Sequence, residues 1–260
     1  MRKWLTVIIP LWLVVILLAA CVTLPDTGKQ AFIMFTPQQE AQMGFAAFNQ
    51  LRRSQKISND PKARALVARV VNRITPHVTA GATQWDYEVF EDEDPNAFAL
   101  PGGKIGVHTG LIALAENEAG LATVIGHECA HVSQRHGGQR MTQQMTAALV
   151  GGLLGASIGG QDRRKQQIFM QSFGIMTGLG ILAFSRQHER EADALGLHYM
   201  AKAGYDPREA LKFWQRMVKA TANKPRPPLW LSSHPADSER IQRIQALIPQ
   251  VLPIYEQSRM

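Results

Sequence analysis

The sequence predicts an α+β fold that is mostly helical and carries one small β-sheet with an exposed edge. Two observations lead to this class. Apolar residues recur at helical spacing through several long segments, and the alternation typical of strands is confined to residues 84–109. A chain of 260 residues can bury a proper core, and we expect residues 36–260 to form one compact domain after processing.

Residues 1–20 have the features of a bacterial lipoprotein signal peptide. A basic end precedes an apolar run that is short for a membrane span. The run closes on Leu18-Ala19-Ala20-Cys21, which resembles a bacterial lipobox. We therefore expect lipidation of Cys21 and a lipidated tether over residues 21–35. An uncleaved anchor helix, or cleavage without lipid, is the alternative.

Export also bears on location and partners. Val22 rather than Asp follows the lipobox, and by resemblance to the enterobacterial sorting rule this favours the periplasmic side of the outer membrane. Removing Arg2 and Lys3 leaves 26 basic and 21 acidic residues, a mild net charge of +5 that suits an anionic membrane surface. No basic cluster with interleaved aromatic residues suggests nucleic acid as a partner, and export argues against it.

Two helices should follow the tether. Thr36-Pro37-Gln38-Gln39 combines an N-cap, a proline at the first helical position and a glutamine three residues after the cap, so a helix is expected to about Arg53. Asp60-Pro61 should start the next helix. Its one-sided apolar stripe consists of Ala63, Leu66, Val67, Val70, Val71 and Ile74.

Residues 84–90 and 104–109 are predicted to be strands. The alternating apolar residues are Trp85, Tyr87 and Val89 in the first strand and Ile105 and Val107 in the second. The acidic run Glu91–Asp94 should end the first strand.

The chemistry is concentrated in the stretch Val124–Val132. His127 and His131 are four residues apart, so on a helix they share one face and can hold one metal ion. Glu128 then lies beside the ion. This set suits zinc hydrolysis: the ion lowers the pKa of a bound water to about 7, and the carboxylate takes the proton as the water attacks a carbonyl. The stretch predicts a peptidase active centre.

The flanks of this stretch favour a helix. Gly137-Gly138 follow where the helix should stop, and Cys129 suits a small buried residue rather than a ligand. The alternative is that both histidines are half-buried structural residues beside a surface Glu128. The apolar face comes from Leu121, Val124, Ile125 and Val132.

Residues 141–184 are ambiguous. Two apolar runs rich in small residues lie on either side of the charged segment Gln161–Lys165, and each is shorter or more interrupted than the ~20 residues needed to cross a bilayer. We expect a helical hairpin packed on the catalytic helices. The alternatives are a membrane-dipping hairpin, a mobile flap over the cleft, or a membrane span of an integral protease.

Residues 185–194 offer a third metal ligand. Catalytic zinc of this kind takes two histidines and one glutamate and keeps a fourth position open, and Glu189 is the candidate. Asp193, one helical turn further on, faces the same way and can fix the tautomer of a ligating histidine. The same run also fits a solvated helix face with charges paired at i, i+4, a role that suits His188 and Glu191 better than metal binding.

The C-terminal part should open with a capping box, Asp206–Glu209, and a helix through about Lys219. The residues expected to face inward are Leu211, Trp214 and Val218, with Phe213 and Met217 widening the stripe. The proline-rich segment 224–228 then forms a stiff loop that presents His234. The remaining histidines are interpreted as structural, and His136 should rotate away from the zinc face; they are His77, His108, His136 and His198.

Together these stretches resemble the HtpX-type (CAAX-prenyl-protease-like) zinc metallopeptidases, a gluzincin family that includes bacterial periplasmic lipoproteins. The motifs that match, in order, are Asn96–Gly103, His127-Glu128-x-x-His131, Ser185-Arg186-x-x-Glu189-x-x-Ala192-Asp193, and His234-Pro235 with Arg240. The resemblance implies zincin-like catalytic helices and one Zn²⁺ per chain, with Glu189 as the third ligand and Asp193 as its supporting partner.

The resemblance also implies substrate contacts. Asn96–Gly103 is similar to the segment that flanks the substrate in this family. An edge strand beside the metal would pair with the extended substrate backbone, with Asn96, Ala97 and Phe98 in contact. Gly102 and Gly103 would let the backbone approach closely. The alternative is that the segment is only a hairpin connection.

Two more residues receive roles from the resemblance. His234 either donates a hydrogen bond to the developing oxyanion or occupies the fourth position on zinc until substrate displaces it. Arg240 is a permanent clamp for the oxyanion or for a carboxylate, because it never loses its charge.

The prediction is therefore a lipid-anchored zinc endopeptidase that degrades misfolded or mislocalised envelope proteins, with possible envelope partner proteins. No tetratricopeptide-like adaptor domain is expected, so the cleft or a partner would select substrates. The competing class is a zinc-binding, chaperone-like or latent lipoprotein with its metal site plugged by His234. Glu128 argues against that class, because a structural metal site has no use for a base.

Overall fold

The structure is a computed structural model. It describes residues 21–79, 84–150, 161–175, 183–221, 226–234 and 239–259. The predicted signal peptide lies outside these ranges, as do Pro235 and parts of the predicted 141–184 hairpin and of the proline-rich loop.

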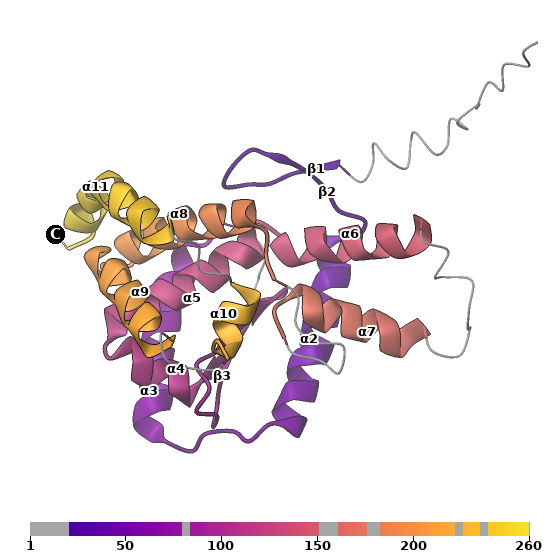
Figure 1. The fold of residues 1–260 in the computed structure, drawn as a ribbon, viewed down its shortest axis with the longest axis horizontal. Coiled ribbons are helices and arrows are strands. Elements are labelled where there is room, and N and C mark those ends of the chain that lie inside the picture. The colour runs from indigo at the N-terminus through magenta and orange to yellow at the C-terminus, as the bar shows by residue number, and fades with distance from the viewer. Residues whose placement is uncertain are drawn as a thin grey trace, which may run out of the picture.

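The mostly helical α+β class is confirmed (Figure 1). The elements are β1 (Cys21–Thr23), β2 (Gln30–Phe32), α2 (Pro37–Ser54), α3 (Pro61–Ile74), a 3₁₀ turn (Thr75–His77), β3 (Asp86–Phe90), β4 (Ala97–Leu100), β5 (Lys104–His108), α4 (Thr109–Ala115), α5 (Glu118–Ser133), α6 (His136–Val150), α7 (Gln161–Ser172), α8 (Arg186–Lys202), α9 (Arg208–Thr221), α10 (Leu229–Ser233) and α11 (Arg240–Ser258).

Helix α5 is the centre of the fold. Every residue from Gly120 to Ser133 is buried, so all faces of this helix are covered. Helices α3, α8 and α9 and strand β4 pack around it, and α11 lies across α8 and α9 (Figure 1). A helix enclosed in this way holds its polar side chains in fixed positions. The histidines of α5 therefore sit in the core rather than in a surface groove.

The helix signals in the N-terminal half are confirmed. Thr36 forms the predicted capping box with Gln39, and Asp60 caps α3 by accepting the Lys62 backbone N–H. The predicted stripe of α3 is buried except for Leu66, which is partly buried. These signals are local in sequence, so the surrounding fold did not override them.

The sheet has three strands in the order β3-β5-β4, with β3 parallel and β4 antiparallel to β5. The His108 N–H donates to the Asn96 carbonyl (2.9 Å), so alternate residues of β4 bond to β5. Ala97 and Ala99 therefore direct their backbone groups toward the outer edge of β4. That edge faces α5.

Three local predictions are wrong. Helix α5 ends at Ser133 rather than at Gly137-Gly138, which lie in the first turn of α6, where Gly138 leaves room for the Glu40 carboxylate. The charged segment Gln161–Lys165 lies within α7 rather than between two helices. Val218 is 45% exposed, because the buried stripe of α9 follows a different helical phase: Ala210, Phe213, Trp214 and Met217.

Residues 21–33 form a β-hairpin that packs on the body of the protein. Leu24 and Ile33 are buried, and Asp26 accepts hydrogen bonds from the Tyr199 hydroxyl (2.7 Å) and the Gln134 amide (3.1 Å). The start of the predicted tether is thus held against α5 and α8. Among the described residues, no helix combines the length and apolar character needed to span a bilayer.

Candidate metal centre

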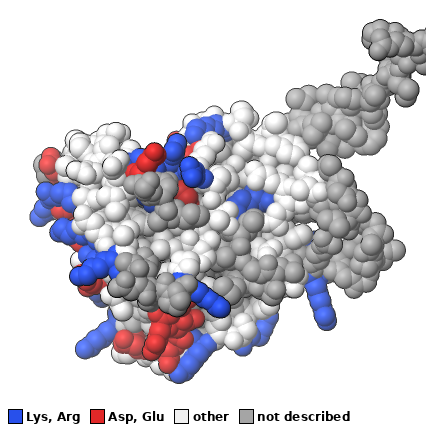
Figure 2. All heavy atoms as spheres, in the orientation of Figure 1, with Lys and Arg blue, Asp and Glu red and all other residues white. Residues whose placement is uncertain are grey.

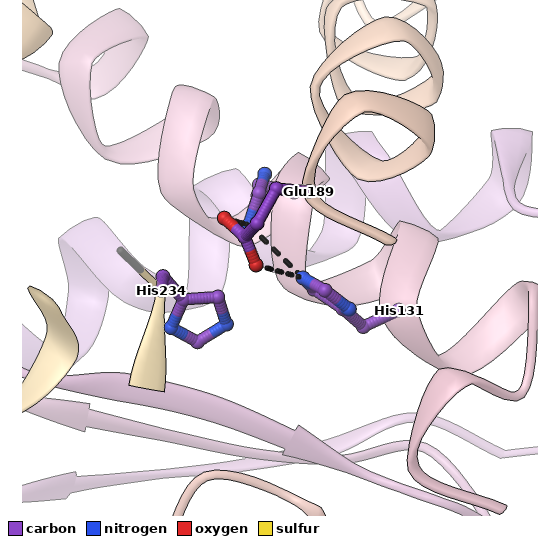
Figure 3. A group of neighbouring side chains, drawn as sticks. His131, Glu189 and His234 are labelled. Carbon is purple, nitrogen blue, oxygen red and sulfur yellow. Dashed lines mark hydrogen bonds and ion pairs between the residues drawn. The ribbon is translucent and has the colours of Figure 1, made fainter. Parts of the chain in front are cut away.

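Four buried side chains converge at the centre of the molecule. His127 and His131 come from α5, Glu189 from α8, and His234 from the end of α10, and their candidate ligand atoms all lie within 4.8 Å of one another (Figure 3). Helices α5 and α8 approach closely where Gly126 faces Gly196; a Cβ on Gly126 would lie 2.9 Å from the Gly196 carbonyl oxygen. This close approach brings Glu189 to the histidine pair.

The distances between these atoms suit one shared cation. The Nε2 atoms of His127 and His131 are 3.1 Å apart, and the Glu189 carboxylate oxygens lie 3.6 and 3.5 Å from them. Ligands about 2.0–2.1 Å from a tetrahedral zinc ion are roughly 3.3 Å from each other. The site therefore has the dimensions of a zinc centre.

The protonation states also fit a metal. Burial lowers the pKa of His127 to about 4 and that of His131 well below its usual value, so both imidazoles are neutral and offer lone pairs. Oε1 of Glu189 and Nε2 of His234 are buried without a hydrogen-bond partner among the described residues. Imidazole nitrogens with one carboxylate form a donor set that suits zinc rather than magnesium or calcium.

Asp193 and Arg240 support the ligands. Asp193 Oδ1 lies 3.1 Å from Nδ1 of His127, the contact expected of a residue that fixes a histidine tautomer. Arg240 donates to Glu189 (2.7 Å) and to Asp193 (2.6 Å) and stacks on the Trp214 ring. Its side chain is fully buried. These contacts favour the carboxylate-clamp alternative over the oxyanion clamp.

The Glu128 carboxylate lies between the histidines, α10 and β4. Its Oε1 accepts a hydrogen bond from the Trp230 indole (2.7 Å) and lies 3.4 Å from Nε2 of His234. Burial raises the pKa of Glu128 to about 8, and hydrogen bonds from Trp230 and from the Ala99 backbone N–H oppose this rise. A carboxyl with a pKa near neutrality is suited to accept and release a proton.

Helix α10 covers the centre. The backbone N–H of Trp230 donates to the Pro95 carbonyl (3.3 Å), and that of Phe184 donates to the Ser233 carbonyl (2.8 Å). The Phe184 ring lies 3.9 Å from the His131 ring, between centroids. His127, Glu128 and His131 are each 3% exposed, so the centre is closed to solvent. Acidic side chains gather on the surface below α10 (Figure 2).

The tautomer of His234 distinguishes its two predicted roles. Its Nδ1 lies 3.1 Å from the Trp230 carbonyl oxygen, which can only accept, and 2.9 Å from the Ser233 hydroxyl, which donates to that same carbonyl and can accept from Nδ1. A proton on Nδ1 satisfies both contacts. Nε2 then presents a lone pair to the other ligand atoms. A lone pair can bind a metal but cannot donate to an oxyanion. This favours the fourth-ligand alternative.

The predicted substrate segment divides into two parts. Asn96, Ala97 and Phe98 lie on or beside β4 and are buried, and Asn96 Oδ1 has no hydrogen-bond partner among the described residues. Gly102 and Gly103 form the turn into β5 with positive φ angles of 78° and 75°, and Gly102 faces Ala41 of α2. Gly102 and Gly103 therefore serve as the connection between two strands, which was the alternative to a role in substrate binding.

Sequence reasoning missed two contacts at this centre. His136 does not rotate away: α5 ends before it and Arg135 adopts φ 49°, which brings His136 Nδ1 to 2.9 Å from His131 Nδ1. No helical periodicity signals a contact across a break. The second missed contact is the hydrogen bond from Trp230 to Glu128. The one available signal in the sequence was that Trp230 lies four residues before the His234 motif.

Residues 61–248 match the model of peptidase family M48. The chain is 30% identical over 239 residues to the beta-barrel assembly-enhancing protease of Escherichia coli (strain K12), covering 91% of this chain and 49% of that protein. It is 34% identical over 184 residues to the mitochondrial metalloendopeptidase OMA1 of Schizosaccharomyces pombe, covering 71% and 52%. The chain thus spans about half the length of these relatives.

Proposed function

This chain belongs to peptidase family M48, and from that premise we propose that it is a zinc endopeptidase of the bacterial cell envelope. The observation that carries the proposal is the convergence of His127, His131 and Glu189, with the carboxylate of Glu128 beside them. We further propose that misfolded or mislocalised envelope proteins are its substrates. The names of its bacterial relatives, beta-barrel assembly-enhancing proteases, support an envelope role.

The mechanism follows from the positions of the chain's own residues. His127, His131 and Glu189 would hold the zinc ion. When bound, zinc supplies Lewis acidity, which polarises the scissile carbonyl and acidifies water. Glu128 takes a proton from the attacking water and passes it to the departing amine. The outer edge of β4, at Ala97 and Ala99, would pair with an extended substrate backbone once Glu128 releases the Ala99 N–H. Such pairing gives affinity without strong sequence preference.

The described conformation corresponds to a latent state of this enzyme. His234 occupies the place of a fourth ligand, Trp230 binds Glu128, and α10 is hydrogen-bonded beside the edge of β4. Movement of α10 away from the centre would release these contacts and give substrate access. The competing function, a chaperone-like zinc lipoprotein that stays plugged, rests on the same His234 contact but leaves Glu128 without a role.

The test measures zinc content and casein cleavage for the full-length protein and for Glu128→Gln. We expect one zinc per chain in both proteins and a loss of cleavage of roughly 100-fold or more in the variant. Zinc retained with unchanged cleavage would reject Glu128 as the base. A wild-type protein that binds zinc and cleaves nothing, even with His234→Ala to unplug the site, would favour the chaperone-like function.

Location is proposed from the lipobox. We propose that lipid on Cys21 holds the protein on the periplasmic side of the outer membrane; Cys21 is exposed at the start of the β1–β2 hairpin. Mass spectrometry of the mature N-terminus and membrane fractionation of Cys21→Ser test this. A variant that still fractionates with the outer membrane would contradict a lipid-only anchor.

A further inference from the structure

A second histidine pair lies behind the candidate metal centre. Nδ1 of His131, the ring nitrogen that points away from the other ligands, is 2.9 Å from Nδ1 of His136. Nε2 of His136 is in turn 3.2 Å from Oε2 of Glu191. His131 and His136 are both buried. The chain of contacts runs from a ligand, through a second ring, to a carboxylate on α8.

The chemistry allows one assignment of protons along this chain. If His131 binds zinc through Nε2, its neutral ring carries the proton on Nδ1, which must donate. His136 Nδ1 is then the acceptor, so the proton of His136 sits on Nε2 and is donated to Glu191. Each group has a partner of the right kind. The reversed arrangement would place the His131 proton on Nε2, at the metal position, and would leave the lone pair of His136 Nε2 facing the Glu191 carboxylate.

Glu191 is itself held in place. Its Oε1 accepts from Lys29 in the N-terminal hairpin (2.5 Å) and from the Gln187 amide (3.0 Å). The His136 ring stacks on His188 with centroids 4.3 Å apart, which fixes its plane. The Glu191 carboxylate fixes the direction of His136 Nε2, and the stacked His188 ring fixes the plane of the His136 ring. His136 therefore has one orientation.

We propose that His136 and Glu191 are positioning residues that set the tautomer and orientation of His131, as Asp193 does for His127. This inference rests on the proposed zinc site. It gives each histidine ligand its own buried partner: a carboxylate for His127, and a histidine backed by a carboxylate for His131. Such partners raise ligand basicity and typically change metal affinity 10- to 100-fold.

The experiment measures the zinc dissociation constant of full-length protein by competition with a chromophoric chelator. His136→Phe keeps a ring of similar size but removes the acceptor, and we expect binding to weaken about 10- to 100-fold. His136→Gln can still accept from His131 and donate to Glu191, so it should recover most of that affinity. The zinc affinity of Glu191→Leu should lie between that of the wild type and that of His136→Phe.

His188→Phe is the matched control, since it keeps an aromatic ring stacked on His136 and removes a ring nitrogen, Nδ1, that has no hydrogen-bond partner among the described residues. It should leave zinc affinity within about threefold of wild type. The absorption spectrum of the cobalt-substituted protein gives a second readout, and His136→Phe should shift its d–d bands while His188→Phe does not.

The outcomes separate this inference from the proposed function. Equal zinc affinity and equal cobalt spectra for wild type and His136→Phe would overturn the inference alone. If His136→Phe does not fold, a wild-type zinc affinity in Glu191→Leu would overturn the inference equally. A protein that binds zinc but cleaves no substrate, even as His234→Ala, would reject the proposed function and leave this inference standing, while a wild-type protein that binds no zinc would reject both.

Discussion

The indole Nε1 of Trp230 donates a 2.7 Å hydrogen bond to Oε1 of Glu128. Trp230 belongs to α10, whereas Glu128 belongs to the central helix α5, so this bond ties the cover of the site to its proposed base. The same α10 ends at His234, whose Nε2 lies 3.4 Å from the same oxygen. One short helix therefore supplies a hydrogen bond to the proposed base and a side chain at the place of a fourth ligand. Displacement of α10 would free Glu128 and the fourth metal position together.

Trp230→Phe should raise casein cleavage. The substitution keeps an apolar ring against Trp214 but removes the bond to Glu128, which is worth about 1 kcal/mol, so the open state should gain roughly fivefold in population. Initial rates at pH 7 measure this. Ser232→Ala is the control, since its hydroxyl donates to the carbonyl of Pro228, the residue that caps α10. A decrease in the rate would show that Trp230 serves the open enzyme instead.

His234→Ala separates the two roles of this histidine by the sign of its effect. If His234 fills the fourth position, its loss should raise cleavage and weaken zinc binding, because one ligand is removed. If it stabilises an oxyanion, cleavage should fall about 10²- to 10³-fold with zinc binding unchanged. Parallel assays of rate and zinc affinity decide, and the tautomer of His234 leads us to expect the first result.

Arg240→Met should destabilise the zinc-free protein by about 3–5 kcal/mol, because it leaves the Asp193 carboxylate buried without its cation and removes a hydrogen-bond donor from Glu189. Zinc should recover part of this loss, since the ion pairs with Glu189. Urea unfolding with and without zinc measures both values. Arg208→Met, which breaks the exposed pair with Asp206, should cost no more than about 1 kcal/mol. An equal loss with and without zinc would contradict the clamp role.

The features that the sequence predicted correctly are local or follow a known motif. The Thr36 cap and the apolar stripe of α3 depend on residues within one or two turns, and their spacing alone determines them. His127 and His131 lie on one helix, so their shared face follows from the helical repeat. Glu189 was the candidate third ligand from the usual donor set of catalytic zinc and again from the resemblance to a family, since no spacing rule connects α5 with α8.

The features that were missed depend on tertiary contacts or on breaks in periodicity. His136 reaches His131 only because the chain turns at Arg135 with a positive φ, which few residues other than glycine adopt. Val218 has the spacing of a buried residue, but α9 turns a neighbouring stripe toward the core. Strand β4 escaped prediction as a strand because its four residues are buried on both faces and show no alternation.

Zinc binding should release protons in a way that depends on pH. Burial raises the pKa of Glu189 to about 8, although Arg240 opposes the rise, so in zinc-free protein at pH 7 this carboxyl is protonated and must lose its proton to bind the ion. His127, with a pKa of about 4, is already neutral and releases none. We therefore expect about one proton from Glu189 per zinc at pH 7.

The sign of the pH dependence follows. Below pH 8 the apparent zinc affinity should rise about tenfold per pH unit, and above pH 8 it should level off as Glu189 ionises without metal. Isothermal titration calorimetry in buffers of different ionisation enthalpy counts the protons. Glu128 also has a pKa of about 8, so the released protons should be counted in Glu128→Gln. In that variant the protons released on zinc binding come from Glu189. No proton release in that variant at pH 7 would mean that the Arg240 clamp keeps Glu189 ionised before the metal arrives.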